Sequence, residues 1–299
     1  MKTPSEFVCK NASPGIGCGL PEMLCLGIFY LISGFYCFIN FVFHVRKSIK
    51  TDTKNNSSGA ISKLFGTFWL SMFVWLTYDG VITIVPFNYS NLTFRIFYLG
   101  LDLILYLIPL SFFVLVVLEF SFAWRNPSNK VVKFFRVVFT IFLSVYLVTG
   151  ALLSLIEPDP NEDPCINLYL WVASTDLLIS LFIIVPAFQL IKLISEPVVQ
   201  PEDVCCVHSS KIGAVLFFIV FMARFAFNIV RLTTIDPLGD WASHKSNVLS
   251  RLYKFAQGFI FNLGAAWLAI VGTSILQRYD FKFLDESTYA RQQNMMLPA

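Results

Sequence analysis

Seven apolar blocks, each long enough to cross a membrane as a helix, dominate this chain. A helix rises about 1.5 Å per residue, so a hydrocarbon core of about 30 Å needs about 20 predominantly apolar residues. The blocks cover residues 20–43, 64–85, 96–118, 137–156, 166–194, 212–230 and 252–276. They predict an all-α integral membrane protein with seven transmembrane helices.

Composition agrees with this class and limits what lies outside the membrane. Hydrophobic residues make up 56% of the chain and charged residues 14%, whereas soluble domains are about 25% charged. The predicted parts are a short lumenal or extracellular head (1–19), a seven-helix membrane domain (20–276) and a short cytoplasmic tail (277–299). The head and tail are too short to bury a core of their own, so we expect one membrane domain.

The distribution of cations predicts which way the chain faces. Lysine and arginine concentrate on the cytoplasmic side of short loops. The side that has the loops after the first, third and fifth blocks, the block end at Lys192 and the tail holds 14 of the 22 Lys and Arg residues. The opposite side holds 7, and Arg224 lies inside a helix. We therefore expect an N-terminus that is outside or lumenal and a C-terminus that is cytoplasmic.

Candidate modification sites follow from this topology. Sequons at Asn11, Asn88 and Asn91 fall outside, which makes the protein a predicted glycoprotein. Cys205 and Cys206 are predicted to be cytoplasmic near a helix start, a placement that allows palmitoylation, while two unmodified thiols are the alternative. Cys9, Cys18 and Cys165 face the oxidising side, and their pairing stays open.

Four charged residues lie well inside the predicted helices. They are Asp79, Asp102, Asp176 and Arg224. Counted from the predicted outer helix ends, Asp79, Asp102 and Arg224 lie about 9–10 Å deep and Asp176 about 15 Å deep. A long arginine side chain can reach either layer, so we expect one polar cluster in the outer half of the bundle.

The predicted cluster has two interpretations. Three acids against one base leave excess negative charge, which a cation, an amine ligand or a proton would balance. Alternatively, the cluster is an interhelical ion pair, with the other acids protonated or near headgroup water. Membrane helices use polar side chains to pack against one another, so a structural role is a full alternative to a binding site.

Motifs for catalysis, metal binding and nucleic-acid binding are absent, so we expect no enzyme, no cofactor and no metal site. There is no H-E-x-x-H, G-x-S-x-G or phosphate-binding glycine loop. His44, His208 and His244 are predicted to lie in loops on different segments. The chain has no evident repeated halves and no pair of broken helices, which argues against the common plans of secondary transporters.

The seven-helix, N-terminus-out layout invites comparison with G-protein-coupled receptors. The place of the usual Asp-Arg-Tyr triplet is taken by Glu119-Phe120-Ser121, and the last block, with GFIFNLGAAWLAIVGTSI, lacks Asn-Pro-x-x-Tyr. A retinal protein is disfavoured too, because the only lysine of that block, Lys254, is at its rim. The sequence does not indicate an ordinary rhodopsin-like receptor.

Three segments resemble another family. They are FFVLVVLEFSFAW (112–124), FMARFAFNIV (221–230) and AWLAIVGTSI (266–275). They are similar to the tobamovirus-multiplication family of plants and its animal relatives, the lysosomal orphan-receptor-like seven-helix proteins. Arg224 and Asn228 match the helix-six pair of that family, and Trp267 with Thr273-Ser274 matches its helix-seven pattern, where Gly272 replaces a proline. Asn228 thereby joins the predicted polar cluster.

The resemblance implies a function that composition alone does not. Members of the family have no known catalysis and act as membrane anchors for small GTPases on vacuolar or lysosomal membranes. It implies a non-enzymatic scaffold or receptor-like signalling regulator in an endomembrane, which recruits a small GTPase or its regulator. The predicted docking surface comprises Arg125, Lys130, Lys133 and Arg136. The alternative is a ligand-sensing receptor, or a transporter of small solutes or ions, centred on the polar cluster.

Overall fold

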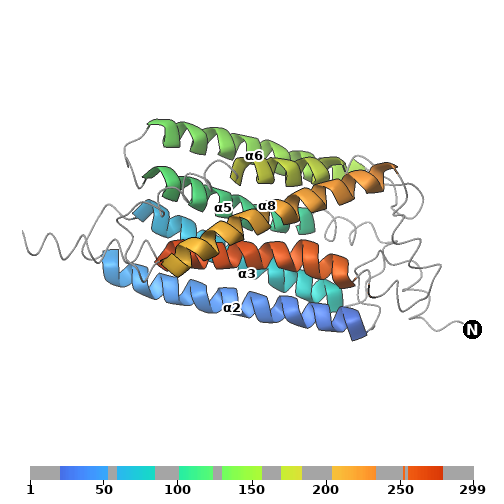
Figure 1. Ribbon diagram of the computed structural model, residues 1–299, viewed down its shortest axis with the longest axis horizontal. Helices are drawn as coiled ribbons and strands as arrows, with labels where there is room; N and C mark the ends of the chain where they lie inside the picture. The colour runs from blue at the N-terminus through green and yellow to red at the C-terminus, as the bar shows by residue number, and fades with distance from the viewer. Residues whose placement is uncertain are drawn as a thin grey trace, which may run out of the picture.

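The protein is all-α throughout the residues that a computed structural model describes, which are 21–52, 59–84, 101–123, 130–156, 170–183, 204–233, 252 and 255–278. The helices are α2 (Pro21–Asp52), α3 (Gly59–Ile84), α5 (Asp102–Ala123), α6 (Lys130–Ile156), Leu170–Ile183, α8 (Val204–Thr233) and Phe255–Arg278. They lie side by side along the long axis of the molecule, and α8 crosses the others obliquely (Figure 1). Within Phe255–Arg278, residues Gly258–Gly264 form a π-helix, η3.

Three of these helices are long and apolar enough to span a membrane. Their apolar stretches are Leu24–Lys47, Lys63–Ile84 and Phe255–Arg278. Shorter apolar helices cover Ile104–Leu118, Val137–Leu153, Leu170–Ile183 and Val215–Phe227. Each predicted block thus overlaps a described helix, and the long apolar helices indicate a membrane protein. The number of membrane crossings and their orientation stay predictions.

The outer face of α6 is apolar along its length. Val137, Ile141, Val145, Val148 and Leu152 are all exposed, and their spacing places them on one face of the helix. The opposite face contains the buried Phe139 and Gly150. A water-soluble protein rarely exposes a continuous apolar stripe of this length, whereas a lipid-facing helix requires one.

The backbones of α2 and α3 pack closely against each other, and this contact depends on glycine. A Cβ at Gly27 would lie 3.1 Å from the carbonyl oxygen of Gly80, and a Cβ at Gly80 would lie 3.1 Å from that of Gly27. A Cβ at Gly34 would likewise meet Thr77 Oγ1 at 2.9 Å. Small residues let helix backbones approach closely, which is how helices gain packing contacts where lipid removes the hydrophobic drive to associate.

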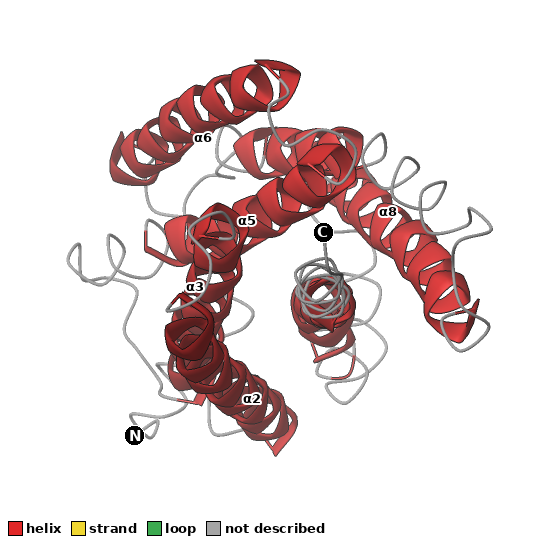
Figure 2. Ribbon diagram, turned by 90° about the vertical axis from the view of Figure 1, so that its left-hand side faces the viewer, coloured by secondary structure: helices red, strands yellow, loops and turns green. Residues whose placement is uncertain are grey.

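Aromatic side chains fill the interior beside this contact. Trp69, Trp75, Phe65 and Phe68 on α3 are all buried almost completely, as is Phe221 on α8. Figure 2 shows why α3 is so well covered, because it lies between α2 and α5 in the arc of helices. The helix Phe255–Arg278 packs inside this arc, where η3 contacts both α2 and α8.

Hydroxyl groups on these helices are largely satisfied by their own backbone. Ser33, Ser111, Ser144, Thr149 and Ser274 each donate to the carbonyl oxygen four residues earlier, at 2.7–2.9 Å. Ser144 and Thr149 are on the exposed side of α6. Such back-bonding hides a polar group that faces lipid and so makes it compatible with an apolar surface.

The histidine prediction was wrong for two of the three residues. His44 lies within α2 and is buried, and His208 lies within α8, while His244 is outside the described residues. The apolar block ends at Phe43, but a helix does not have to end where its apolar sequence ends. Backbone hydrogen bonding continues α2 to Asp52. Because α3 also begins early, at Gly59, the two helices are separated by residues 53–58 and not by the predicted 44–63.

Candidate functional site

Asp176 and Arg224 form a largely buried ion pair between two helices. Asp176 is near the middle of the helix Leu170–Ile183, and Arg224 is in the second half of α8. Arg224 Nε lies 3.1 Å from Asp176 Oδ2, with the side chain of Asp176 0% exposed and that of Arg224 12% exposed. Two charges this far from water persist only when each compensates the other.

Tyr106 on α5 completes the coordination of the carboxylate. Its hydroxyl donates a hydrogen bond to Asp176 Oδ1 at 3.0 Å, so both carboxylate oxygens have a partner. The guanidinium carbon of Arg224 also lies 4.2 Å from the centroid of the Tyr106 ring. The same tyrosine therefore contacts both charges, the acid through its hydroxyl and the base through its π face.

The π-helix supplies a further acceptor for the arginine. Arg224 Nη1 donates to the backbone carbonyl of Phe261 at 3.3 Å, and Phe261 lies inside η3. At the start of the same segment, the Tyr30 hydroxyl of α2 donates to the Gly258 carbonyl at 3.3 Å. Wider i→i+5 turns displace backbone groups from their usual partners, which makes their carbonyls available to side chains.

These contacts tie four helices together. We use the name Asp176–Arg224 cluster for Asp176, Arg224, Tyr106 and the Phe261 carbonyl. Its members come from Leu170–Ile183, α8, α5 and Phe255–Arg278, which are far apart in sequence. Each charged group has a partner of opposite charge and a second polar partner, so the arrangement is suited to holding helices in register.

The other residues of the predicted cluster have different outcomes. Asp79 is buried on α3, 6% exposed and one helical turn after Trp75. Asp102 is the first residue of α5, and Asn228 lies on α8 one turn after Arg224, but their side chains are outside what the structure describes. Of the predicted set, the structure brings Asp176 and Arg224 into contact.

Trp75 packs on the Asp176–Arg224 cluster and keeps an unusual polar atom. Its ring meets the edge of Tyr106 with centroids 5.2 Å apart. Within the described part of the chain, Trp75 Nε1, Thr273 Oγ1 and Glu22 Oε2 are the buried side-chain polar atoms without a hydrogen-bond partner. An unpartnered buried N–H is costly, so Trp75 is a position where an additional polar partner would stabilise the protein.

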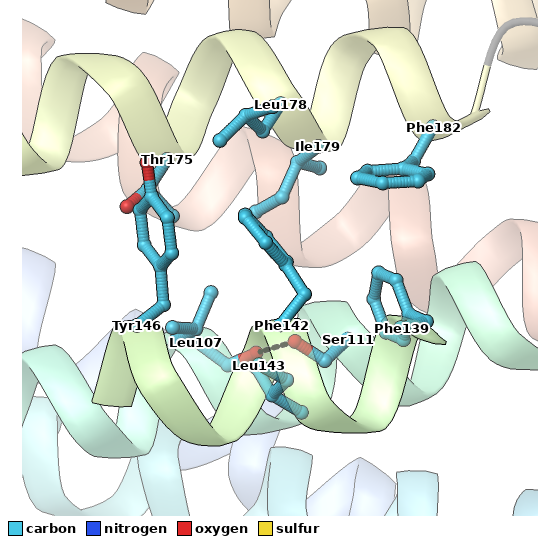
Figure 3. A pocket seen from close by; sticks show the side chains of 10 residues that line it. All are labelled: Leu107, Ser111, Phe139, Phe142, Leu143, Tyr146, Thr175, Leu178, Ile179 and Phe182. Carbon is cyan, nitrogen blue, oxygen red and sulfur yellow. Dashed lines mark hydrogen bonds between the residues drawn. The ribbon is translucent and has the colours of Figure 1, made fainter. Parts of the chain in front are cut away.

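A small cavity lies between α5, α6 and Leu170–Ile183 (Figure 3). Its volume is about 10 Å³, and its lining is mostly Leu, Ile and Phe. Ser111 and Thr175 on its wall donate their hydroxyls to backbone carbonyls of their own helices. This volume is about that of one water, far below the 300–1,000 Å³ typical of ligand pockets.

Sequence reasoning missed Tyr106, Trp75 and the Phe261 carbonyl. Tyrosine and tryptophan in apolar helices are ordinary packing residues, and the π-helix left no recognisable signal in its sequence. The only hint for Tyr106 was its position one turn after Asp102, on a helix already predicted to contribute to the cluster.

The other candidate residues lie either outside the described residues or at the starts of α6 and α8. Asn11, Asn88, Asn91 and Arg125 lie outside the described residues. Lys130, Lys133 and Arg136 are in the first two turns of α6, and Cys205 and Cys206 are in the first turn of α8. In the described ranges, no group of three or more His, Cys, Asp or Glu residues is arranged to hold a metal ion.

Comparison with known proteins provides no relative. The chain matches no protein-family model, no curated protein and no solved structure.

Proposed function

We propose that this protein is a non-enzymatic membrane scaffold or receptor-like regulator with seven transmembrane helices. The described helices and the apolar stripe on α6 support membrane insertion. The bias of lysine and arginine supports an outside or lumenal N-terminus and a cytoplasmic C-terminus. The resemblance to the tobamovirus-multiplication family supports an endomembrane location of the vacuolar or lysosomal kind.

The observation that carries this proposal is the internal satisfaction of the Asp176–Arg224 cluster. Both carboxylate oxygens and two nitrogens of the guanidinium already have protein partners. A binding site for a small charged ligand usually presents charge to a cavity, whereas these groups present it to one another. A scaffold has to keep one arrangement of its helices, and a set of fully partnered polar contacts across four helices serves that purpose.

The proposed partner is a small GTPase or its regulator on the cytoplasmic face. Arg125, Lys130, Lys133 and Arg136 form a short basic segment, and a GTPase presents acidic switch loops that change with the bound nucleotide. Such a contact would weaken at higher salt. Topology alone also produces basic loops, so binding has to be tested separately from charge.

Proximity labelling from the C-terminus tests this docking. We expect the parent to enrich a small GTPase or its regulator, and a variant with Arg125, Lys130 and Lys133 all changed to alanine to lose that enrichment. The matched control changes Lys2, Lys10 and Lys245 to alanine, which removes the same charge from the predicted opposite side. Equal enrichment in both variants, or none in the parent over a matched seven-helix protein, would reject the docking.

The alternative function, ligand sensing or transport, has one observation in its favour. Trp75 Nε1 is buried beside the Asp176–Arg224 cluster without a partner, so an arriving polar group would find a donor there. Proteoliposomes with a trapped pH indicator test the simplest case, which is proton flux. The scaffold predicts no flux above empty vesicles, whereas transport through the cluster predicts flux that Asp176→Asn abolishes.

A further inference from the structure

A second set of buried polar side chains, His44, Trp69 and Gln277, joins α2, α3 and the end of the helix Phe255–Arg278. His44 is 4% exposed, and its Nδ1 lies 2.7 Å from Gln277 Nε2. The indole Nε1 of Trp69 lies 2.9 Å from Gln277 Oε1 and donates to it. We call this the His44 chain. It spans more than 200 positions of sequence, and Gln277 is one residue before Arg278, where the described helix ends.

The chemistry of the three groups determines the protonation of His44. An indole nitrogen only donates, so the atom of Gln277 that faces Trp69 has to be its oxygen. The amide nitrogen of Gln277 then faces His44, and an amide nitrogen also only donates. His44 Nδ1 must therefore accept with its lone pair, which makes the imidazole neutral with its proton on Nε2.

Adding a proton to His44 breaks this arrangement. A protonated Nδ1 would direct its N–H at the N–H of the Gln277 amide. Turning the amide over would not help, because its nitrogen would then face the Trp69 N–H. In either orientation two donors meet in a buried site, and one of them loses its acceptor at a cost comparable to an unmade buried hydrogen bond.

An aromatic ring and a backbone segment of α3 lie close to the His44 ring. The ring of Phe65 lies 6.1 Å from the His44 ring, centroid to centroid, and His44 Cδ2 passes close to Gly66. Lys50 and Asp52 of α2 are also near His44 in sequence, but their side chains lie outside what the structure describes. The described titratable residues nearest along the three elements are Tyr36, Cys37, Arg46 and Lys47 on α2, Lys63 on α3 and Arg278 on the last helix. The four cations among them are exposed, and their charge opposes another positive charge nearby.

We propose that His44 is a proton-binding site and that the His44 chain is a pH-sensitive latch on the last helix. The closed latch requires neutral His44, so it holds at neutral and alkaline pH. As the pH falls through the titration of the imidazole, the proton competes with Gln277 and the latch opens. Histidine is the side chain whose ordinary titration falls between about pH 5 and 8. Opening frees the helix end from which residues 279–299 continue.

The indole signal of Trp69 reports the latch directly. The full-length protein is labelled with ¹⁵N-tryptophan, placed in nanodiscs and followed by NMR from pH 8 to pH 5, with Trp69→Phe to assign the resonance. We expect the Trp69 resonance of the parent to shift along a single titration curve. In His44→Asn, whose side-chain oxygen replaces Nδ1 as an acceptor without titrating, we expect no shift.

Placing a negative charge at Gln277, the middle residue of the His44 chain, should reverse the sign of the pH dependence of the melting temperature. In Gln277→Glu, one carboxylate oxygen accepts from Trp69 and the other accepts from protonated His44. Acidification from pH 8 to 6 should then raise the melting temperature in detergent relative to the double variant Gln277→Glu/His44→Asn. In the parent, the same change should lower it relative to His44→Asn, by about 2–4 °C.

His208→Asn is the matched control, because it removes a histidine that is outside the His44 chain, and it should retain the pH response of the parent. A parent whose pH response equals that of His44→Asn, or a Gln277→Glu variant with the same sign as the parent, would overturn the latch. If His44→Asn does not fold, the direct comparison of Gln277→Glu with the parent decides, because the same acidification should raise the melting temperature of Gln277→Glu relative to that of the parent. None of these measurements depends on the proposed docking partner.

Discussion

Arg224 shows how a single residue organises the bundle. Arg224 forms an ion pair with Asp176, stacks on the ring of Tyr106 and donates a hydrogen bond to the backbone carbonyl of Phe261. Arginine is suited to this role because its planar group donates in several directions at once. Lysine would provide the charge but not the same set of directed contacts.

Replacing Arg224 by alanine should destabilise the protein strongly. The buried Asp176 would lose its counter-charge, and an orphaned charge inside a membrane costs several kcal/mol, against about 1 kcal/mol for an ordinary polar contact. We expect a lower melting temperature in detergent and poorer expression, with partial recovery in Arg224→Ala/Asp176→Asn. The exposed Arg278→Ala is the control. Parent-like stability of Arg224→Ala, without coupling to Asp176, would contradict the pair.

Tyr106→Phe separates the hydroxyl from the ring. It removes the hydrogen bond to Asp176 Oδ1 but leaves an aromatic face for Arg224. Bonds to charged groups contribute about 1.5–3 kcal/mol, whereas neutral ones contribute about 1 kcal/mol. Tyr146→Phe is therefore a suitable comparison, because it removes a neutral bond to Ser174. Equal losses of unfolding free energy in the two variants would show that Asp176 is not charged.

At the scale of helices, close packing depends on where side chains are missing. The α2–α3 contact needs Gly27 and Gly80 on facing sides, whereas Gly213 on α8 has nothing within 4 Å of where its Cβ would be. The same residue type is thus essential in one helix and dispensable in another. The π-helix is a second device at this scale, since its carbonyls at Gly258 and Phe261 receive donors from α2 and α8.

Gly80→Ala and Gly213→Ala should have opposite effects. The new methyl at position 80 would lie 2.8 Å from Leu31 Cγ and Cδ2 and 3.1 Å from the Gly27 oxygen. Overpacking of this kind costs about 1–3 kcal/mol. In open space on a helix, Gly→Ala stabilises by about 0.4–1 kcal/mol. Thermal unfolding of both variants in one detergent checks the difference, and a stable Gly80→Ala would mean that α2 and α3 are further apart.

For the whole molecule, the arrangement is that of a protein whose solvent is lipid. Large apolar side chains are exposed along α2, α6 and α8, whereas the Asp176–Arg224 pair is largely buried. This distribution reverses what water would select, because the apolar outside matches the hydrocarbon core and the polar inside avoids it. The interior of the bundle includes the Asp176–Arg224 cluster and the His44 chain, each of which joins three or more of the described helices.

Topology can be tested with single cysteines and an impermeant thiol reagent. In sealed microsomes, whose cytoplasmic side faces outward, cysteines placed at Lys54 and Lys130 should be labelled. A cysteine at Asp159 should require detergent. The background is a variant with all seven native cysteines replaced, because Cys205 and Cys206 are predicted to lie on the cytoplasmic side and would be labelled too. Labelling in the reverse pattern would overturn the orientation and, with it, the cytoplasmic docking surface.

What the sequence by itself determined is the class of protein and the positions of its helices. Apolar content is a one-dimensional property, so the blocks locate helices, and the predicted depths of Asp176 and Arg224 follow from counting residues. Counting also places Asp79 and Asp102 at comparable depths, and therefore it could not select the partner of Arg224. Depth fixes the layer of a residue but not the direction in which its side chain points around the helix axis.

Only the tertiary structure decided that direction. It pairs Arg224 with Asp176, introduces Tyr106 and the Phe261 carbonyl, and buries His44 between Trp69 and Gln277 instead of in a loop. The rotation of each helix results from packing side chains of several helices at once, with glycines allowing the closest approach. No local stretch of sequence contains that information, because each contact joins residues tens to hundreds of positions apart.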